Sequence, residues 1–358
     1  MKRGRNIFII SLILSIFGLI AIFTASWQWA YFYLNNTYYF LEHQFIYLFL
    51  GIALSFLISL FSLDFLRKTS LFLLIFCIIL TYLVFVKDIG KNIRGVNRWI
   101  DLGIIQFQPA PFLAFSWILF LASFLSKKRK DLSNLHIVWI LIFLSIFGIA
   151  FYYQPNMSML ILFSLATFTV LFFSNFDLKK LIPIFLLAFL VIFFLTKTAN
   201  YREERIKSFS MEGKNFPLFS TYQQLQAIRI IRDGGIIGKG WGRNFYKFFL
   251  PEAYNDFIFP VILGEGGWIA GFILIALYSL LVYNVFLFAM EEKNIFNYLL
   301  LTGIISFWCW QILLNIFMSL GFLPVMGLPL PFVSFGGSSL ISNWMKVGLI
   351  LKISSQRG

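Results

Sequence analysis

Residues 7–26 read IFIISLILSIFGLIAIFTAS and contain no ionisable side chain. As a helix these residues rise about 30 Å, which is the thickness of the hydrocarbon core of a bilayer. The run is longer than the apolar part of a typical secretory signal, and no small-x-small cleavage site follows it. We therefore expect an uncleaved first membrane span here.

The same composition continues along the chain of 358 residues, of which 60% are hydrophobic and 12% are charged. So little charge cannot cover a soluble domain, and long apolar runs favour helices over a membrane barrel of short alternating strands. We expect an all-α fold, a polytopic membrane helical bundle that forms a single domain over residues 1–358. The predicted spans, about ten in number, are residues 7–26, 44–63, 70–86, 110–126, 135–151, 158–174, 181–196, 258–289, 296–319 and 337–353.

The formal net charge of +14 raises the question of nucleic-acid binding, but its distribution suggests another explanation. If the N-terminus is cytoplasmic, fourteen of the 29 basic residues fall in inner segments. The short outer loops near 27–43, 152–157 and 320–336 contain none. Basic residues in short loops resist translocation, so this asymmetry predicts that both termini are cytoplasmic. We expect no nucleic-acid partner.

Two outer segments, 87–109 and 197–257, carry fourteen more basic residues. Either an anionic ligand binds on the outer face, or the charges are solvated and contact lipid headgroups. The segment 197–257 is a large extracytoplasmic loop between helices 7 and 8, and loops of that length are usually functional or disordered. In it we predict an amphipathic helix on the outer membrane surface, which Ser220 or Thr221 caps and Gly234–Gly235 ends. Its apolar stripe is Tyr222, Leu225, Ile228 and Ile231.

The glycine-rich turn Gly238–Gly242 follows that helix. Its glycines permit a ligand to approach the backbone closely, but they suit tight turns equally well. Asp256 comes directly before the eighth span, where it either caps the helix or acts as a base in a half-dry site. Glu265 lies inside the span, where a charge is costly and needs a partner.

Residues 321–339 contain three prolines and no charge. Such a segment suits neither a helix nor a solvated loop, so we predict a membrane-buried loop that lines a cavity. Ser338 or Ser339 is a candidate cap for the last helix. The only two histidines, His43 and His136, are predicted on opposite sides of the membrane, which leaves no members for a histidine metal site or a Ser-His-Asp relay. Cys77 and Cys309 lie in apolar runs and are expected to be reduced thiols.

Taken together, these motifs resemble the SEDS (shape, elongation, division and sporulation) family of bacterial membrane proteins along the whole chain. The matching residues are Arg98–Trp99–Ile100, Leu102–Gly103, Gln108–Pro109–Ala110, Gln154–Pro155, Leu250–Pro251–Glu252, Asp256–Phe257–Ile258–Phe259, Gly264–Glu265 and Leu328 through Ser339. Within the family, Thr24–Ala25–Ser26 and Tyr39–Phe40–Leu41 are more similar to the division branch, FtsW, than to the elongation branch, RodA.

The resemblance implies a peptidoglycan glycosyltransferase of the bacterial cytoplasmic membrane. It would polymerise lipid II, invert the anomeric carbon and release undecaprenyl pyrophosphate. Asp256 would be the catalytic residue. The implied partners are a class B penicillin-binding protein and other divisome or elongasome membrane proteins. Our substrate-binding candidates are Arg98, Lys239, Arg243 and Lys247 for the pyrophosphate, together with Glu265, Ser338 and Ser339. A divalent cation, Mg or Mn, is a candidate cofactor.

Four positions depart from the family pattern. Pro111 and Ala114 stand where the family usually has Glu and Lys, Asn156 where it has Asp, and Gly266 where it has a second Glu. These substitutions keep open a catalytically weakened scaffold for the penicillin-binding protein. A lipid II flippase or transporter is a further alternative, because charges inside a helical bundle are also what a transport pathway requires.

Overall fold

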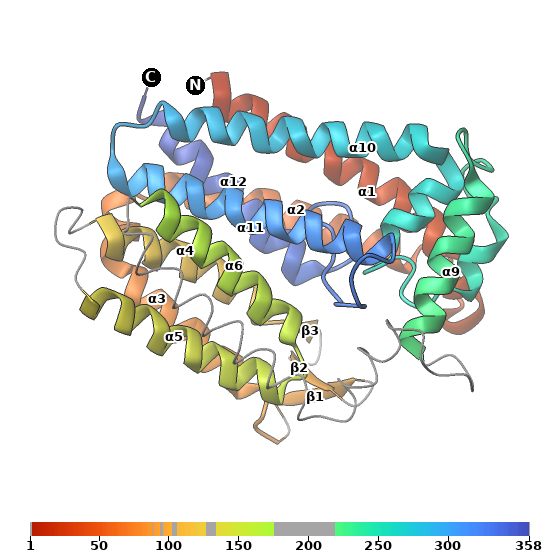
Figure 1. Cartoon of the computed structure of the whole chain (residues 1–358), viewed down its shortest axis with the longest axis horizontal. Helices are drawn as coiled ribbons and strands as arrows, with labels where there is room; N and C mark the ends of the chain where they lie inside the picture. Colours follow the sequence, from red (N-terminus) through yellow and green to blue (C-terminus); the bar gives the residue numbers. More distant parts are fainter. Residues whose placement is uncertain are drawn as a thin grey trace.

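The computed structural model describes residues 2–87, 89–93, 96–101, 106–126, 134–174 and 219–357. Nine helices in these ranges match nine predicted spans, while the predicted seventh span at 181–196 lies outside the described residues (Figure 1). They are α1 (Lys2–Leu34), α2 (Tyr39–Leu60), α3 (Leu63–Leu83), α4 (Ala110–Ser126), α5 (Asn134–Tyr153), α6 (Met157–Phe173), α10 (Ile258–Met290), α11 (Ile295–Ser319) and α12 (Gly337–Ser355).

By length and composition, α1, α2, α10, α11 and residues 136–153 of α5 are apolar enough to cross a membrane. Helices α4 and α6 are apolar but shorter. The prediction of a multi-pass membrane protein with a helical bundle is confirmed. Both termini lie at one end of the bundle, and the sheet and α9 (Phe219–Gly234) lie toward the other (Figure 1).

Several predicted span ends were wrong. Helix α1 continues to Leu34 and α2 begins at Tyr39, so the predicted outer loop at 27–43 shrinks to residues 35–38. Helix α3 begins at Leu63, where Ser62 accepts a hydrogen bond from the Phe65 amide at 3.2 Å and caps the helix. The break between the second and third spans therefore falls at residues 61–62. No glycine or proline marks these ends, so hydropathy alone did not locate them.

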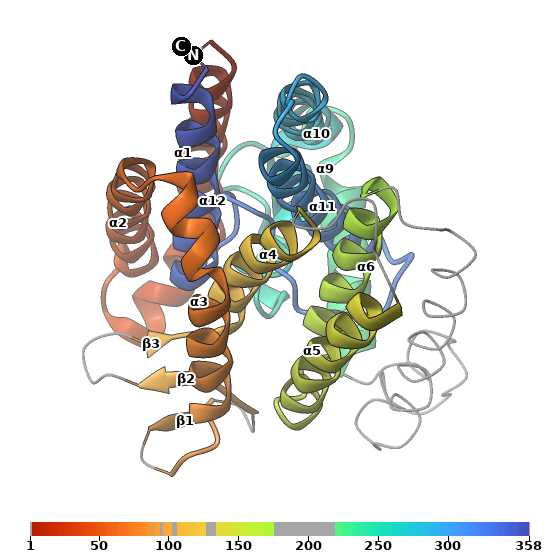
Figure 2. The same cartoon turned by 90° about the vertical axis from the view of Figure 1, so that its left-hand side faces the viewer.

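The outer segment 87–109 contains a small antiparallel sheet that the all-α prediction missed (Figure 2). Its strands are β1 (Gly90–Ile93), β2 (Val96–Asp101) and β3 (Gln106–Phe107), and Lys91 pairs with Trp99 across the first two. The Lys91 ammonium lies 2.6 Å from an Asp101 carboxylate oxygen. The sheet holds Arg98 at a fixed place on β2.

Helix α10 is not the continuous span that the sequence predicts. Gly267 has φ 66° and ψ −172°, so the helix breaks there after a short, almost wholly buried first segment. The turn after α9 fills this break: the amide of Gly240 donates to the Glu265 carbonyl at 2.9 Å, and that of Trp268 to the Gly235 carbonyl at 3.1 Å. A Cβ on Gly238 would lie 2.1 Å from the Glu265 carbonyl oxygen. The glycines therefore allow two backbones to pack closely.

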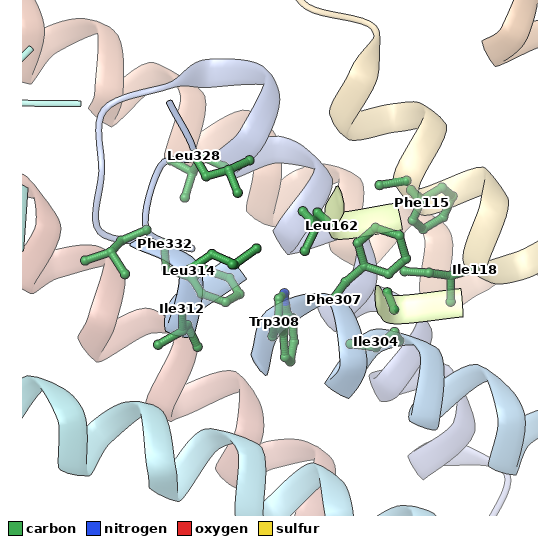
Figure 3. Close-up of a cluster of buried hydrophobic side chains, with 14 of the residues drawn as sticks. Phe115, Ile118, Leu162, Ile304, Phe307, Trp308, Ile312, Leu314, Leu328 and Phe332 are labelled. Atoms are coloured by element: carbon green, nitrogen blue, oxygen red, sulfur yellow. The ribbon is translucent and has the colours of Figure 1, made fainter. Parts of the chain in front are cut away.

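Helix α11 lies at the centre of the apolar core (Figure 3). Its Phe307 ring packs edge-on against Phe163 of α6 with centroids 5.2 Å apart, and Trp308 packs against Phe332 at 5.4 Å. The same helix thus contacts α6 on one side and the segment between α11 and α12 on the other. Both cysteines, Cys77 and Cys309, are free, as predicted.

Lys346 of α12 is buried in the bundle interior. Its ammonium donates to the Asn343 side-chain oxygen at 3.0 Å, and the same oxygen accepts from the Trp308 indole at 2.9 Å. Among the residues that the structure describes, no carboxylate lies within ion-pair distance of this lysine. Asn343 therefore joins a buried cation of α12 to the central helix.

At two glycines in the membrane spans, we expect substitution by alanine to have opposite effects on stability. A Cβ on Gly18 of α1 would lie 2.7 Å from the Val333 carbonyl oxygen, whereas a Cβ on Gly148 of α5 meets only Leu160 methyls, at 3.7 Å or more. We expect Gly18→Ala to lower the free energy of unfolding by about 1–3 kcal/mol through overpacking. Gly148→Ala should be neutral or stabilising by up to about 1 kcal/mol through helix propensity. Denaturation of the native chain and both variants in mild detergent measures these changes. Equal changes in the free energy of unfolding for the two variants would contradict the prediction.

Candidate active site

The segment between α11 and α12, residues 320–336, contains no helix and is largely buried. We call it the buried loop. Leu328, Leu330, Phe332, Val333 and Ser334 are all inaccessible or nearly so. The predicted burial of this loop is confirmed, while the cavity that it was predicted to line stays a prediction. Its backbone has no helical hydrogen bonds over most of its length, so its polar groups need other partners.

Side chains from five helices supply these partners by donating to carbonyl oxygens of the buried loop. The hydrogen bonds run from Gln311 to Pro329 (2.6 Å), Asn315 to Leu328 (2.6 Å), Tyr278 to Pro331 (2.6 Å), Gln224 to Leu323 (2.6 Å), Gln44 to Ser334 (3.1 Å) and Ser158 to Met326. Gln44 also accepts from the amide of Gly336 at 3.2 Å. An unsatisfied buried carbonyl costs about 1–3 kcal/mol, so these donors determine where the loop lies.

Asp256 lies against this loop. A Cβ on Gly327 would be 3.4 Å from the Asp256 Oδ2 atom, so the carboxylate passes close to the loop backbone. The Asn315 amide donates to the backbone carbonyl of Asp256 at 2.8 Å as well as to that of Leu328. One side chain of α11 therefore fixes the carboxylate-bearing residue and the loop relative to each other.

The position of Asp256 bears on its two predicted roles. Helix α10 begins at Ile258 and its N-cap residue is Phe257, so Asp256 precedes the cap position. The residue is half-buried, so it lies between the protein interior and the surface. Asp256 is therefore not the helix cap, and its role as a base stays a prediction.

Arg98 reaches the same region from the sheet. Its guanidinium donates to the carbonyl oxygens of Gln154, at 2.9 Å, and of Pro155, just after the C-terminal end of α5. Ser158 lies in the first turn of the next helix, α6, and donates to the carbonyl of Met326, beside Gly327. Through these contacts Arg98 is connected to the buried loop, against which Asp256 lies. Its guanidinium also has a structural role, because carbonyls at a helix C-terminus attract cations.

Lys247 and Glu265 correct our substrate-binding prediction. The two side chains are 0% exposed and form an ion pair with each other, so neither reaches a ligand at the surface. Burial lowers the pKa of Lys247, and the Glu265 carboxylate opposes that shift. The prediction that Glu265 needs a partner is confirmed. The pair joins the short helical turn η1 (Phe245–Phe249) to α10.

Lys239 and Arg243 are accessible but do not lie beside Asp256. Lys239 is half-exposed and pairs with Asp233 at 3.2 Å, and Arg243 is exposed. The Lys239 amide donates to the Gly264 carbonyl, near the far end of the first segment of α10. A helical segment of about nine residues rises about 13 Å, which separates this turn from Asp256. The structure therefore does not gather the four predicted pyrophosphate cations around the carboxylate.

Ser338 and Ser339 lie in the first turn of α12, whose N-cap is Gly336, so neither is the predicted cap. The Ser338 hydroxyl accepts a hydrogen bond from the backbone N–H of Gln108 at 2.9 Å. The Ser342 hydroxyl donates to the backbone carbonyl of Pro111 at 2.6 Å. These bonds join the start of α12 to the start of α4. Two motifs that are far apart in the sequence thus meet in the bundle.

The predicted helix in the large loop is present as α9, but Ser220 and Thr221 lie inside its first turn and not at its cap. Its buried residues include Gln223, Gln226, Ala227 and Ile230, each one position removed from the predicted apolar stripe, and Gln224 is buried as well. Leu225 of that stripe is exposed. The helix packs on α10 and the buried loop with a partly polar face, because its glutamines meet loop carbonyls.

Sequence reasoning did not identify the donors that hold the buried loop. Gln311 and Asn315 are four residues apart on α11 and therefore on one face of that helix. Uncharged amides in an otherwise apolar span were the available signal, since buried polar groups require partners.

Within the ranges that the structure describes, no three His, Cys, Asp or Glu side chains gather into a group that could hold a metal ion. The divalent cation, Mg or Mn, stays a prediction. We derive no step of the reaction through a metal.

Comparison with known proteins gives consistent results. Stage V sporulation protein E of Bacillus subtilis is 30% identical over 353 residues, which cover 97% of this chain and 95% of that protein. A probable peptidoglycan glycosyltransferase FtsW of Haemophilus influenzae is 30% identical over 98% of this chain and 90% of its own length.

Among solved structures, a chain of a peptidoglycan synthase complex that coordinates polymerization and crosslinking superposes with a TM-score of 0.81 at 24% identity, covering 98% of this chain and 97% of that one. RodA of Thermus thermophilus superposes with a TM-score of 0.73 at 23% identity, covering 98% and 96%. These structures share the fold. The model of the FtsW, RodA and SpoVE cell cycle proteins matches residues 4–358. The chain therefore belongs to the FtsW/RodA/SpoVE family, the SEDS proteins.

Proposed function

We propose that this chain is a peptidoglycan glycosyltransferase that polymerises lipid II at the outer face of the bacterial cytoplasmic membrane. The observation that carries this proposal is the half-buried Asp256 carboxylate, which lies against the buried loop on a backbone that Asn315 fixes. Relatives named as probable FtsW glycosyltransferases support the activity. The two chain ends lie together, away from the sheet and α9, which supports cytoplasmic termini (Figure 1).

Lipid II combines a long isoprenoid tail, a pyrophosphate and a disaccharide. In the proposed reaction, a sugar hydroxyl of the acceptor attacks the anomeric carbon of the donor while Asp256 accepts the hydroxyl proton. The new glycosidic C–O bond forms as the bond to the pyrophosphate oxygen breaks. Undecaprenyl pyrophosphate leaves with the electron pair, and the anomeric carbon is inverted.

The leaving pyrophosphate gains negative charge and is best stabilised by cations that are already in place. Arg98 is our candidate among the predicted cations, because its contacts lead through Ser158 and Met326 to the loop at Asp256. Lys239 and Arg243 are placed to attract lipid headgroups or substrate at the outer surface and not at the reacting bond. Ser338 and Ser339 remain candidates at the junction of α12 and α4.

The protein partner of this chain is also a proposal. A fold shared with a chain of a peptidoglycan synthase complex supports pairing with a transpeptidase, which we propose to be a class B penicillin-binding protein. Other division or elongation membrane proteins are further proposed partners.

The departures from the family pattern bear on the scaffold alternative. Gly266 lies at the break in α10, where a Cβ would be 2.4 Å from the Ala270 Cβ, so this conformation leaves no space for a side chain there. Asn156 is buried, and its amide nitrogen has no hydrogen-bond partner among the described residues. Gly266 therefore fits the local packing, whereas Asn156 leaves a buried amide without a partner among the described residues. Because the two departures differ in this way, the activity of the native chain must be measured directly.

Asp256→Asn tests the catalytic role. The substitution keeps the size of the side chain and the backbone hydrogen bond from Asn315, so the fold should persist while the base is lost. We expect the rate of glycan strand synthesis from labelled lipid II to fall at least about 100-fold. The assay uses the purified chain with its transpeptidase partner.

Asp233→Asn is the matched control, because Asp233 lies on α9 and pairs with Lys239 at the surface. It should keep nearly full activity. Strand synthesis by Asp256→Asn at the control rate would contradict the proposal. Failure of the folded native chain to make strands would favour the scaffold, and transbilayer movement of lipid II without strands would favour the transporter.

Lys247 and Glu265 provide a second test, which separates a structural ion pair from substrate binding. Lys247→Met leaves the Glu265 carboxylate buried without a partner and should cost about 3–5 kcal/mol of stability. Glu265→Gln added to that variant removes the unpaired charge, so most of the stability and the polymerisation should return. A stable double variant that makes no glycan strands would instead assign the pair a direct role with substrate.

A further inference from the structure

A groove of about 470 Å³ lies at the end of the bundle that holds both termini, remote from Asp256. Lys2, Arg5 and Phe8 of α1 line one side, and Phe56 of α2 and Ser355 of α12 line the others. Nothing in the proposed polymerase chemistry uses this groove. It therefore needs its own explanation.

The basic residues at this end fall into two sets. Arg3 and Arg357 are paired: both contact the Glu291 carboxylate, and Arg357 lies 3.2 Å from Glu292 as well. Hydrogen bonding from Arg3 lowers the pKa of Glu291, so this acid stays ionised at neutral pH.

Lys2 and Arg5, which line the groove, contact no carboxylate among the described residues. Both side chains are exposed, and the first turn of α1 adds the partial positive charge of a helix N-terminus. Glu291 and Glu292 are thus paired with Arg3 and Arg357, while Lys2 and Arg5 give the lining of the groove a positive charge.

The walls of the groove are apolar and open toward lipid. Phe56 lies in a membrane span yet is 52% exposed, and its ring lies 5.7 Å from that of Phe8. Leu57 and Leu60 on the same helix, and Ile9 on α1, are exposed too. Side chains of this kind on a spanning helix face acyl chains, so the groove joins a cationic end to the bilayer interior.

We propose that this groove binds an anionic phospholipid of the inner leaflet. Its phosphate lies between Lys2 and Arg5, and an acyl chain follows Phe8 and Phe56. The two unpaired cations select a negatively charged headgroup, and the lateral apolar opening selects a lipid over a free phosphate ion. This inference depends on cytoplasmic termini and not on polymerase activity.

The test uses the purified full chain in phosphatidylcholine nanodiscs that contain a small fraction of spin-labelled phosphatidylglycerol. Retention of labelled lipid is compared for the native chain, Lys2→Gln/Arg5→Gln and the control Lys68→Gln/Lys293→Gln. The control removes two exposed charges from the same side of the membrane but outside the groove. We expect the groove variant to bind phosphatidylglycerol about 25-fold more weakly, roughly fivefold for each charge, and the control to change little.

Ser355→Trp gives an independent test, because it fills the exposed side of the groove and keeps every charge. It should lose the lipid as well. Free inorganic phosphate should not compete at millimolar concentration. Equal loss in the two charge variants would show a general surface attraction and would overturn the proposal, as would equal retention of labelled phosphatidylcholine by the native chain.

Discussion

Buried backbone carbonyls without helical partners are the constraint on which the half of this protein around Asp256 depends. The buried loop, residues 320–336, enters the bundle with no charge and little regular structure, so each carbonyl must find a donor there. The donors include Gln44, Gln224, Gln311, Asn315 and Tyr278, and these five come from four helices, α2, α9, α10 and α11. Because each unmade bond is costly, the loop can occupy only a narrow range of positions.

The candidate catalytic residue takes its position from this arrangement. Asn315 donates to the backbone of Asp256 and to the loop at once, and Gly327 leaves room for the carboxylate. Because α10 breaks at Gly267, its first segment does not have to run in the same direction as the rest of the helix. The buried pair of Lys247 and Glu265 then attaches η1 to that segment. The structural ion pair therefore lies at the far end of the first segment of α10, away from the candidate catalytic carboxylate of Asp256.

Much of this was predictable from the sequence. Apolar length located nine spans that the structure describes, the charge-free proline-rich segment indicated the buried loop, and the cost of a buried carboxylate required a partner for Glu265. The sheet was missed because its strands are short and lie in a basic outer segment. The roles of the cations could not be predicted, because composition does not show whether a lysine meets a ligand, as expected for Lys247, or an internal acid, as observed.

The break in α10 had a visible signal in Gly264–Glu265–Gly266–Gly267, but glycines there are compatible with close helix packing too. Only the close approach of the turn at Gly238 to α10 distinguishes a helix break from close helix packing. The loop donors could have been suspected from amides in apolar spans, yet their partners lie far away in sequence. Sequence periodicity carries no information about such contacts.

The rate of lipid II polymerisation by Asn315→Leu, compared with Gln311→Leu, tests the central claim most directly. Each substitution on α11 removes a side-chain donor to the buried loop, but only Asn315 also contacts Asp256. The two variants should lose similar stability, about 1–3 kcal/mol. The account predicts that turnover falls at least about tenfold more in Asn315→Leu. Equal turnover in the two folded variants would contradict the claim that this amide positions the catalytic carboxylate.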